Sequence, residues 1–144
     1  MPGFRQDTKL AVLKQSPLFG GLSRKQLVQI ARLSDDLDVP VGTILCKEGS
    51  RGREFFVVID GEAEVTKGGK HVATIGPGGF FGEIALLERV QRTATVTAAT
   101  PLHFFVITDQ AFTSVLDTDP TIERTLLRTL ARRLVALSGD PTLG

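Results

Sequence analysis

The sequence predicts an α+β fold that is mainly β, in which a small antiparallel barrel or sandwich lies between N-terminal and C-terminal helices. Three observations predict it: helical spacing of apolar residues over residues 8–37, many short β-branched runs divided by glycines over residues 38–108, and helical spacing again over residues 109–138. At 144 residues the chain is long enough for one domain with its own core and short for two. We therefore expect a single domain over residues 1–144.

The first region predicts short helices without a chemical motif. Leu10 and Leu13 precede a break at residues 17–21, which contains one proline and two glycines. Ser23 is a residue type that caps helices, and apolar residues follow it at helical intervals. We expect these helices to occupy residues 8–37.

The middle region predicts strands of four to eight residues that are rich in valine, isoleucine, threonine and phenylalanine. They cover residues 39–46, 55–59, 63–66, 71–75, 93–98 and 103–107. Asp60-Gly61 and Gly68-Gly69 lie between strands and predict tight hairpins, because such turns need positive φ angles.

The last region predicts two helices. Thr108 or Asp109 caps the first, which runs through Leu116, and Asp119-Pro120 opens the second, which ends at residues 139–141. The second helix has an apolar stripe with arginines opposite it; the stripe is Ile122, Leu126, Leu130, Leu134 and Leu137 and the arginines are Arg124, Arg128, Arg132 and Arg133. Two interpretations stay open for this stripe: it packs on the barrel, or it pairs with its copy in a homodimer.

Composition argues against several classes of function. The 17 basic and 16 acidic side chains leave a net charge of +1, which favours neither nucleic acid nor a membrane surface as partner. No apolar run approaches the ~20 residues that span a bilayer, and the N-terminus has no secretory pattern. The single cysteine, Cys46, is expected to be a buried core thiol in a reducing compartment, so we expect a cytoplasmic protein.

No residue pattern indicates an enzyme or a metal site. His71 and His103 lie in separate predicted strands without an acidic companion at ligand spacing, and no serine lies in a Gly-x-Ser-x-Gly elbow. We therefore expect a protein without catalytic residues, metal or cofactor.

The informative segment interrupts the strands at residues 79–94. Its glycines lead into a short helical turn, whose unpaired backbone N–H groups suit a phosphate. Arg92 follows at the mouth of an apolar strand and would bind a phosphate with its guanidinium. The carboxylate of Glu83 would accept a hydrogen bond from a ribose hydroxyl. Together these groups predict a pocket for a ribose that carries a phosphate.

Phe81-Gly82-Glu83-Ile84-Ala85-Leu86-Leu87, followed by Arg92-Thr93-Ala94-Thr95-Val96, resembles the phosphate-binding cassette of the cyclic nucleotide-binding domain family. The motifs at residues 17–23, 60–63 and 112–116 also follow the family's order, so the resemblance covers about residues 16–137. It implies an antiparallel β-roll like that of cAMP receptor proteins and protein kinase A regulatory subunits, here as a stand-alone member of bacterial type. Many members have proline before the arginine, whereas this chain has Gln91.

The resemblance also implies a role for each cassette residue. Gly82 and Glu83 would contact the ribose, with Ile84 beside them; the N–H of Ala85 and the side chain of Arg92 would bind the cyclic phosphate. Thr93 would add a hydroxyl contact to the phosphate or to a syn purine. Structural alternatives stay open: a turn glycine for Gly82, a helix-terminal charge for Glu83, an internal ion pair for Arg92 and a plain strand residue for Thr93.

In the family, ligand binding moves the helices. By resemblance Leu86 would move and repack against Phe112 and Leu116, which would form the hinge. An arginine of the last helix, or a leucine such as Leu127 or Leu130, would cover the purine.

Two classes of function follow. The first is a non-catalytic sensor or buffer that binds a cyclic nucleotide, cAMP in preference to cGMP, and regulates an unknown protein partner in trans. The second is a ligand-free scaffold that keeps only the fold. A DNA-binding regulator is disfavoured, because no recognition helix follows Leu137.

Overall fold

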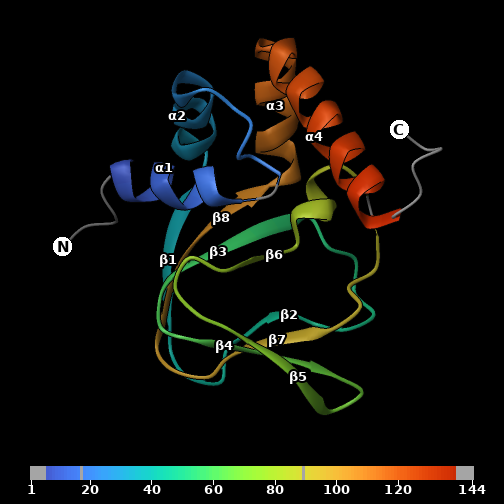
Figure 1. The fold of residues 1–144 in the computed structure, drawn as a ribbon. Helices are drawn as coiled ribbons and strands as arrows, with labels where there is room; N and C mark the ends of the chain where they lie inside the picture. Colours follow the sequence, from blue (N-terminus) through green and yellow to red (C-terminus); the bar gives the residue numbers. More distant parts are fainter. Residues whose placement is uncertain (1–5, 17, 89, 139–144) are drawn as a thin grey trace.

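In the part of the chain that the structure describes, two antiparallel sheets of four strands each lie face to face, and four α-helices lie at one end of them (Figure 1). The computed structural model describes residues 6–16, 18–88 and 90–138, including every side chain in these ranges except those of residues 6, 7, 83, 84, 133 and 138. Pro17 and the helix end predicted at residues 139–141 are therefore outside the described residues. The arrangement confirms the predicted fold class, a mainly β roll between flanking helices.

The upper sheet in Figure 1 has the strand order β1-β8-β3-β6 and the lower sheet the order β2-β7-β4-β5. The strands are β1 (Asp35–Val39), β2 (Ile44–Cys46), β3 (Glu54–Asp60), β4 (Ala63–Lys67), β5 (Lys70–Ile75), β6 (Phe80–Phe81), β7 (Thr95–Ala98) and β8 (Leu102–Thr108). The helices are α1 (Gln6–Gln15), α2 (Arg24–Arg32), the 3₁₀ turn η1 (Glu83–Leu86), α3 (Asp109–Thr118) and α4 (Pro120–Ser138).

The β3–β8 pair separates two apolar cores. Alternate side chains of a strand point to opposite faces, and Phe56 and Val58 face the lower sheet, where they pack with Phe104 and Val96. Phe55 faces the helices, and the centroid of its ring lies 5.4 Å from that of Phe19. Because both faces of these two strands are covered, their sequences are nearly continuous apolar runs.

The structure corrects three details of the predicted strands. Residues 39–46 are two strands, because the chain turns at Gly42 (φ 89°) and β1 and β2 belong to different sheets. β1 begins at Asp35, within the region predicted to be helical, because these residues pair with Val106 and Phe105 of β8. Asp60-Gly61 is not a hairpin but carries the chain from β3 in one sheet to β4 in the other. The hairpin predicted at Gly68-Gly69 is confirmed between β4 and β5.

The helix caps form as predicted. The hydroxyl of Ser23 accepts a hydrogen bond from the N–H of Gln26 in a capping box, and that of Thr108 accepts from the N–H of Ala111. At the start of α4, the amide of Gln26 donates to the hydroxyl of Thr121 over 2.9 Å. The same Thr121 hydroxyl donates to the Asp119 carboxylate, and this bond holds the pKa of Asp119 below its usual value. α2 is thereby tied to the α3–α4 junction.

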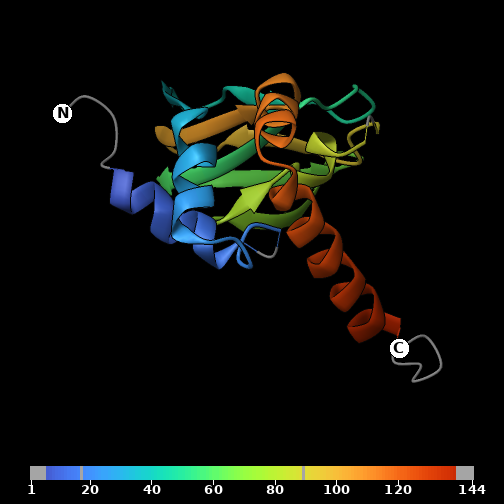
Figure 2. The same ribbon diagram turned by 90° about the horizontal axis from the view of Figure 1, so that it is seen from above.

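The second half of α4 leaves the body of the molecule (Figure 2). Ile122 and Leu126 are buried under α2 and α3, whereas Leu134 and Leu137 are 66% and 81% exposed. The predicted apolar stripe therefore packs on the rest of the chain only through its first part. Homodimerisation through its exposed part stays a prediction. In the described part of the chain, no helix has both the length and the apolar character to cross a membrane.

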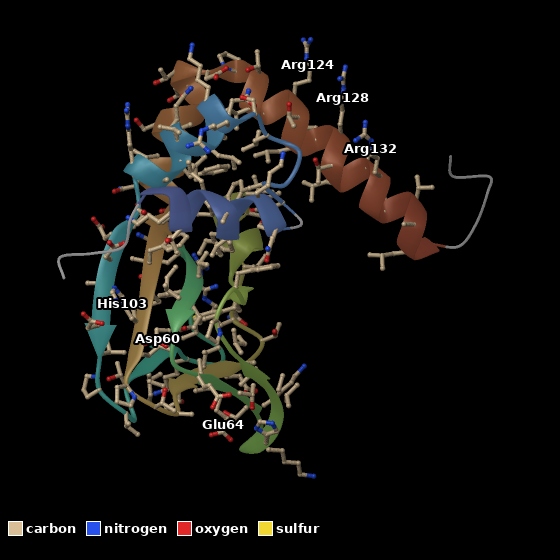
Figure 3. All side chains as sticks on the ribbon, turned by 60° about the vertical axis from the view of Figure 1, so that its left-hand side comes forward. Asp60, Glu64, His103, Arg124, Arg128 and Arg132 are labelled. Atoms are coloured by element: carbon tan, nitrogen blue, oxygen red, sulfur yellow. The ribbon has the colours of Figure 1, made fainter. Side chains whose placement is uncertain are left out.

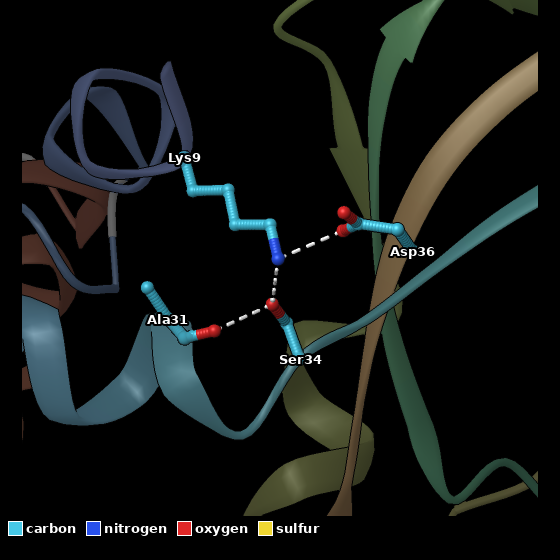
Figure 4. A network of polar contacts seen from close by, with 4 residues as sticks. All are labelled: Lys9, Ala31, Ser34 and Asp36. Atoms are coloured by element: carbon cyan, nitrogen blue, oxygen red, sulfur yellow. Dashed lines mark hydrogen bonds and ion pairs between the residues drawn. The ribbon is translucent and has the colours of Figure 1, made fainter. Parts of the chain in front are cut away.

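A buried lysine joins α1 to β1 (Figure 4). The ammonium of Lys9 lies 2.8 Å from a carboxylate oxygen of Asp36 and donates to the hydroxyl of Ser34 over 3.0 Å. That hydroxyl donates in turn to the carbonyl of Ala31. The ammonium also lies 5.8 Å from the ring centroid of Phe105. These contacts fix the orientation of α1 on the upper sheet.

Lys9→Met keeps the apolar stem but removes the ammonium that faces the Asp36 carboxylate. We expect the free energy of unfolding to fall by about 1–3 kcal/mol, because a shielded charge loses its partner. Urea denaturation measures the change. Lys67→Met, at an exposed strand end, is the matched control and should change the value by less than about 0.5 kcal/mol. Equal losses in the two variants would contradict the role of the network.

Candidate functional site

A pocket of about 490 Å³ opens between the inner face of the lower sheet and the segment around η1. Its floor consists of the side chains of Cys46, Val65 and Val96. Its walls come from the predicted cassette; they are Phe81, Gly82, Ala85, Val90, Gln91, Arg92, Thr93 and Ala94. The volume is within the usual range of small-ligand sites, and the lining is mostly apolar with a single described cation, Arg92.

The backbone at Gly82 forms the turn that leads into η1. Gly82 has φ 85°, a conformation that favours glycine, and its carbonyl accepts the N–H of Ala85 over 3.0 Å. A phosphate that binds the Ala85 N–H would have to share or replace this hydrogen bond. Glu83 and Ile84 lie in η1, but their side chains are among those outside the description, so their predicted ligand contacts stay predictions.

The guanidinium of Arg92 lies in a slot that two glycines leave open. A Cβ atom at Gly52 would overlap the guanidinium, and one at Gly82 would lie 2.5 Å from Nη1. Nη2 donates to the backbone carbonyl of Glu54 over 2.8 Å, and the guanidinium carbon lies 5.9 Å from the ring centroid of Phe56. Among the described side chains no carboxylate forms an ion pair with Arg92. Its charge is thus positioned by neutral groups and remains available to an anion.

Backbone hydrogen bonds hold the segment that carries Arg92 against the loop before β3. The N–H of Arg92 donates to the carbonyl of Ser50 over 2.6 Å, and the N–H of Gly49 donates to the carbonyl of Arg92 over 2.8 Å. The N–H of Gly52 donates to the carbonyl of Val90 over 3.2 Å. The sequence alone did not indicate that Gly49 and Gly52 take part in the site. Two glycines three positions apart, just before the apolar run that begins at Phe55, were the feature of the sequence that could have indicated this role.

Cys46 is buried as predicted, and it also forms part of the pocket floor. Burial raises the pKa of its thiol to about 11, although the nearby positive charge of Arg92 opposes part of that rise. The thiol is therefore neutral at physiological pH and contributes a small, weakly polar surface to the pocket. Thr93 lines the pocket while remaining exposed.

The three predicted hinge residues lie together. Leu86 and Phe112 are buried in the core beneath the helices, and Leu116 packs against the same core. Leu86 follows the cassette glycine by four positions, so the wall of the pocket and the base of α3 meet at this side chain. A shift of η1 would therefore be transmitted to α3 by direct packing. The movement itself stays a prediction.

The two histidines lie outside the pocket. His71 pairs with Glu64 over 3.3 Å on the β4–β5 hairpin, and His103 lies 3.4 Å from Asp38 on the upper sheet. The labelled Glu64 and His103 are well separated in Figure 3. No group of three or more potential metal ligands occurs among the residues that the structure describes.

The chain is similar in sequence and in fold to known proteins that contain a cyclic nucleotide-binding domain. The family model for the cyclic nucleotide-binding domain matches residues 37–119. A cyclic nucleotide-gated potassium channel of Rhizobium etli is 32% identical over 117 residues, which cover 81% of this chain and 33% of the channel. The chain spans about a third of the length of the curated relatives it matches first.

Two solved structures share the fold. The N-terminal domain of a transcriptional regulator from Streptomyces coelicolor has a TM-score of 0.81 and 28% identity, covering 89% of this chain and 93% of that domain. The regulatory domain of Toxoplasma gondii PKA, crystallised with cAMP, has a TM-score of 0.70 and 30% identity, covering 76% of this chain and 44% of that one. The resemblance inferred from the cassette is confirmed.

Gly52→Ala should place a methyl group where the Arg92 guanidinium lies. We expect a loss of about 1–3 kcal/mol in unfolding free energy, the usual cost of overpacking a filled site. In an Arg92→Ala background the same substitution should cost much less, because the overlap is gone. Gly76→Ala is the control: no atom lies within 4 Å of the position that its new methyl group would take. Additive losses in the double variant, measured by urea denaturation, would contradict the slot.

Proposed function

Because this chain belongs to the cyclic nucleotide-binding domain family, we propose that its pocket binds a cyclic nucleotide, with cAMP preferred, and regulates a protein partner without catalysing a reaction. The observation that carries this proposal is the Arg92 guanidinium, which among the described residues is held at the pocket wall by neutral groups. A positive charge prepared in this way favours an anion in an otherwise apolar pocket.

The proposed pose follows from the lining. The cyclic phosphate contacts the guanidinium of Arg92 and the N–H of Ala85, and the ribose lies toward Gly82 and Glu83. The purine then lies over the apolar floor near Val65 and Val96. Cyclic nucleotides carry one negative charge, which the single described cation of the lining would neutralise.

The preference for cAMP is supported by one similar structure, whereas the lining accommodates either purine. The Toxoplasma gondii structure, which is similar over most of this chain, was crystallised with cAMP. Thr93 lines the pocket, remains exposed and would accommodate either purine.

The proposed output is a change in the position of α4. Phosphate binding draws η1 toward Arg92, Leu86 shifts against Phe112 and Leu116, and α3 carries α4 with it. The exposed second half of α4 leaves room for this movement, because it has few contacts to lose. A ligand that favours the shifted state would then change the surface that α4 offers to a partner.

Arg92→Ala should lower the affinity for cAMP by about 2–5 kcal/mol, because the phosphate would be left without its charged partner. Calorimetric titration of the purified chain with cAMP and with cGMP measures this loss. Arg53→Ala removes an exposed arginine near the same loop and is the control, with affinity close to that of the native chain. An unchanged affinity in Arg92→Ala would exclude the proposed pose. A folded native chain that binds neither nucleotide would favour the scaffold interpretation.

Leu86→Ala should separate binding from the response. We expect affinity for cAMP close to the native value, since the Leu86 side chain lies in the core under α3 and not in the pocket. Hydrogen exchange in α4 should change less on cAMP binding than it does in the native chain. The variant should also lose about 2–4 kcal/mol of stability, so the comparison is made at a temperature at which both chains are folded. An equal loss of affinity in Leu86→Ala and Arg92→Ala would contradict the separate roles.

A further inference from the structure

The outward side of α4 carries a line of exposed apolar residues. Leu127 and Leu134 are 62% and 66% exposed, and the exposed Ala131 lies between them in sequence. Residues at intervals of three and four share one side of a helix, so these three form a continuous apolar strip. Large apolar side chains gathered on one side of a protruding helix mark an interaction surface.

A row of arginines runs beside this strip. Arg124, Arg128 and Arg132 are spaced by four residues and point away from the sheets (Figure 3). None of them forms an ion pair with a carboxylate that the structure describes. Glu123 is the one acidic residue in the sequence of α4. The row therefore presents positive charge that nearby described groups do not neutralise.

A second copy of the chain is a poor match for this surface. Its α4 would bring the same three arginines against these arginines and offer only Glu123 in return. Like charges at a helix interface are destabilising, and opposite charges beside an apolar strip select a partner. The charge of the surface therefore favours a partner with carboxylates.

From this arrangement we propose that the outward side of α4 binds an acidic amphipathic helix of a partner protein. The apolar side of that helix packs on Leu127, Ala131 and Leu134. Its carboxylates, one turn apart at about 6 Å, match the spacing of the arginine row. The surface lies on α4 and not on the pocket lining, so this proposal does not depend on nucleotide binding.

The full chain is titrated into a fluorescein-labelled peptide of about three heptads, with leucine at the a and d positions and glutamate at the b, c, e and g positions, so that carboxylates lie about one turn apart on both flanks. We expect a saturable rise in anisotropy that weakens as salt is added. The triple variant R124E/R128E/R132E should bind at least about tenfold more weakly, because three attractive pairs become repulsive. A charge-reversed peptide with lysine in place of glutamate should bind this variant and not the native chain.

The matched control, K47E/K67E/K70E, makes the same change of charge at exposed positions of the β-roll. It should bind the acidic peptide within about twofold of the native chain, because these charges are remote and screened. Circular dichroism checks that both variants are folded. Equal weakening in the two variants, or no binding by the native chain, would overturn the proposal. So would binding to phosphatidylserine vesicles without binding to the peptide, or a native dimer that L127E/L134E converts to a monomer.

Discussion

Strands β3 and β8 must be apolar on both faces, and the rest of the molecule is arranged around that constraint. Phe55, Val57 and Ile107 face the helices, while Phe56 and Phe104 face the lower sheet. A pair buried on both sides needs two covering layers, and one layer is the lower sheet while the other is formed by α1, α2 and α3 (Figure 1). Since Glu54 is the first residue of β3 and Gly52 lies just before that strand, the same pair of strands also positions the backbone that holds Arg92.

The charge of Arg92 is thus held by the start of β3 and the loop before it, whereas the proposed response to a ligand would begin in η1. Arg92 is held by the carbonyl of Glu54 at the start of β3 and by backbone hydrogen bonds to the loop before that strand. A guanidinium that is already held in place would need little reorganisation to bind an anion, which favours binding of charged groups. η1, in contrast, is a single 3₁₀ turn whose N–H at Ala85 is bonded only within the turn. Movement on ligand binding would be easiest there, next to Leu86 and the base of α3.

α4 is packed at its start and exposed towards its end, which suits the two roles proposed for it. Its first turns are tied to α2 by Gln26 and Thr121 and are buried at Ile122 and Leu126. Its later turns have exposed leucines and arginines, which a partner would cover at little cost to the fold. A helix that is fixed at one end and free at the other converts a small rotation at its base into a large displacement at its tip. The surface that we propose for an acidic helix lies on this free part.

The sequence alone determined the fold class, the caps at Ser23 and Thr108 and the segment that forms the pocket wall, because these depend on local patterns: periodicity, residue type and the spacing of Gly82 and Arg92. It misassigned residues 35–37 as helical and Asp60-Gly61 as a hairpin, because strand pairing and the sheet to which a strand belongs depend on partners far away in the chain. It also missed Gly52, whose importance arises only where its missing Cβ meets the Arg92 guanidinium. Only the tertiary structure decided that Cys46 forms part of the pocket floor. It also decided that the leucine stripe of α4 is buried at one end and exposed at the other. Both depend on which distant residues pack against each position.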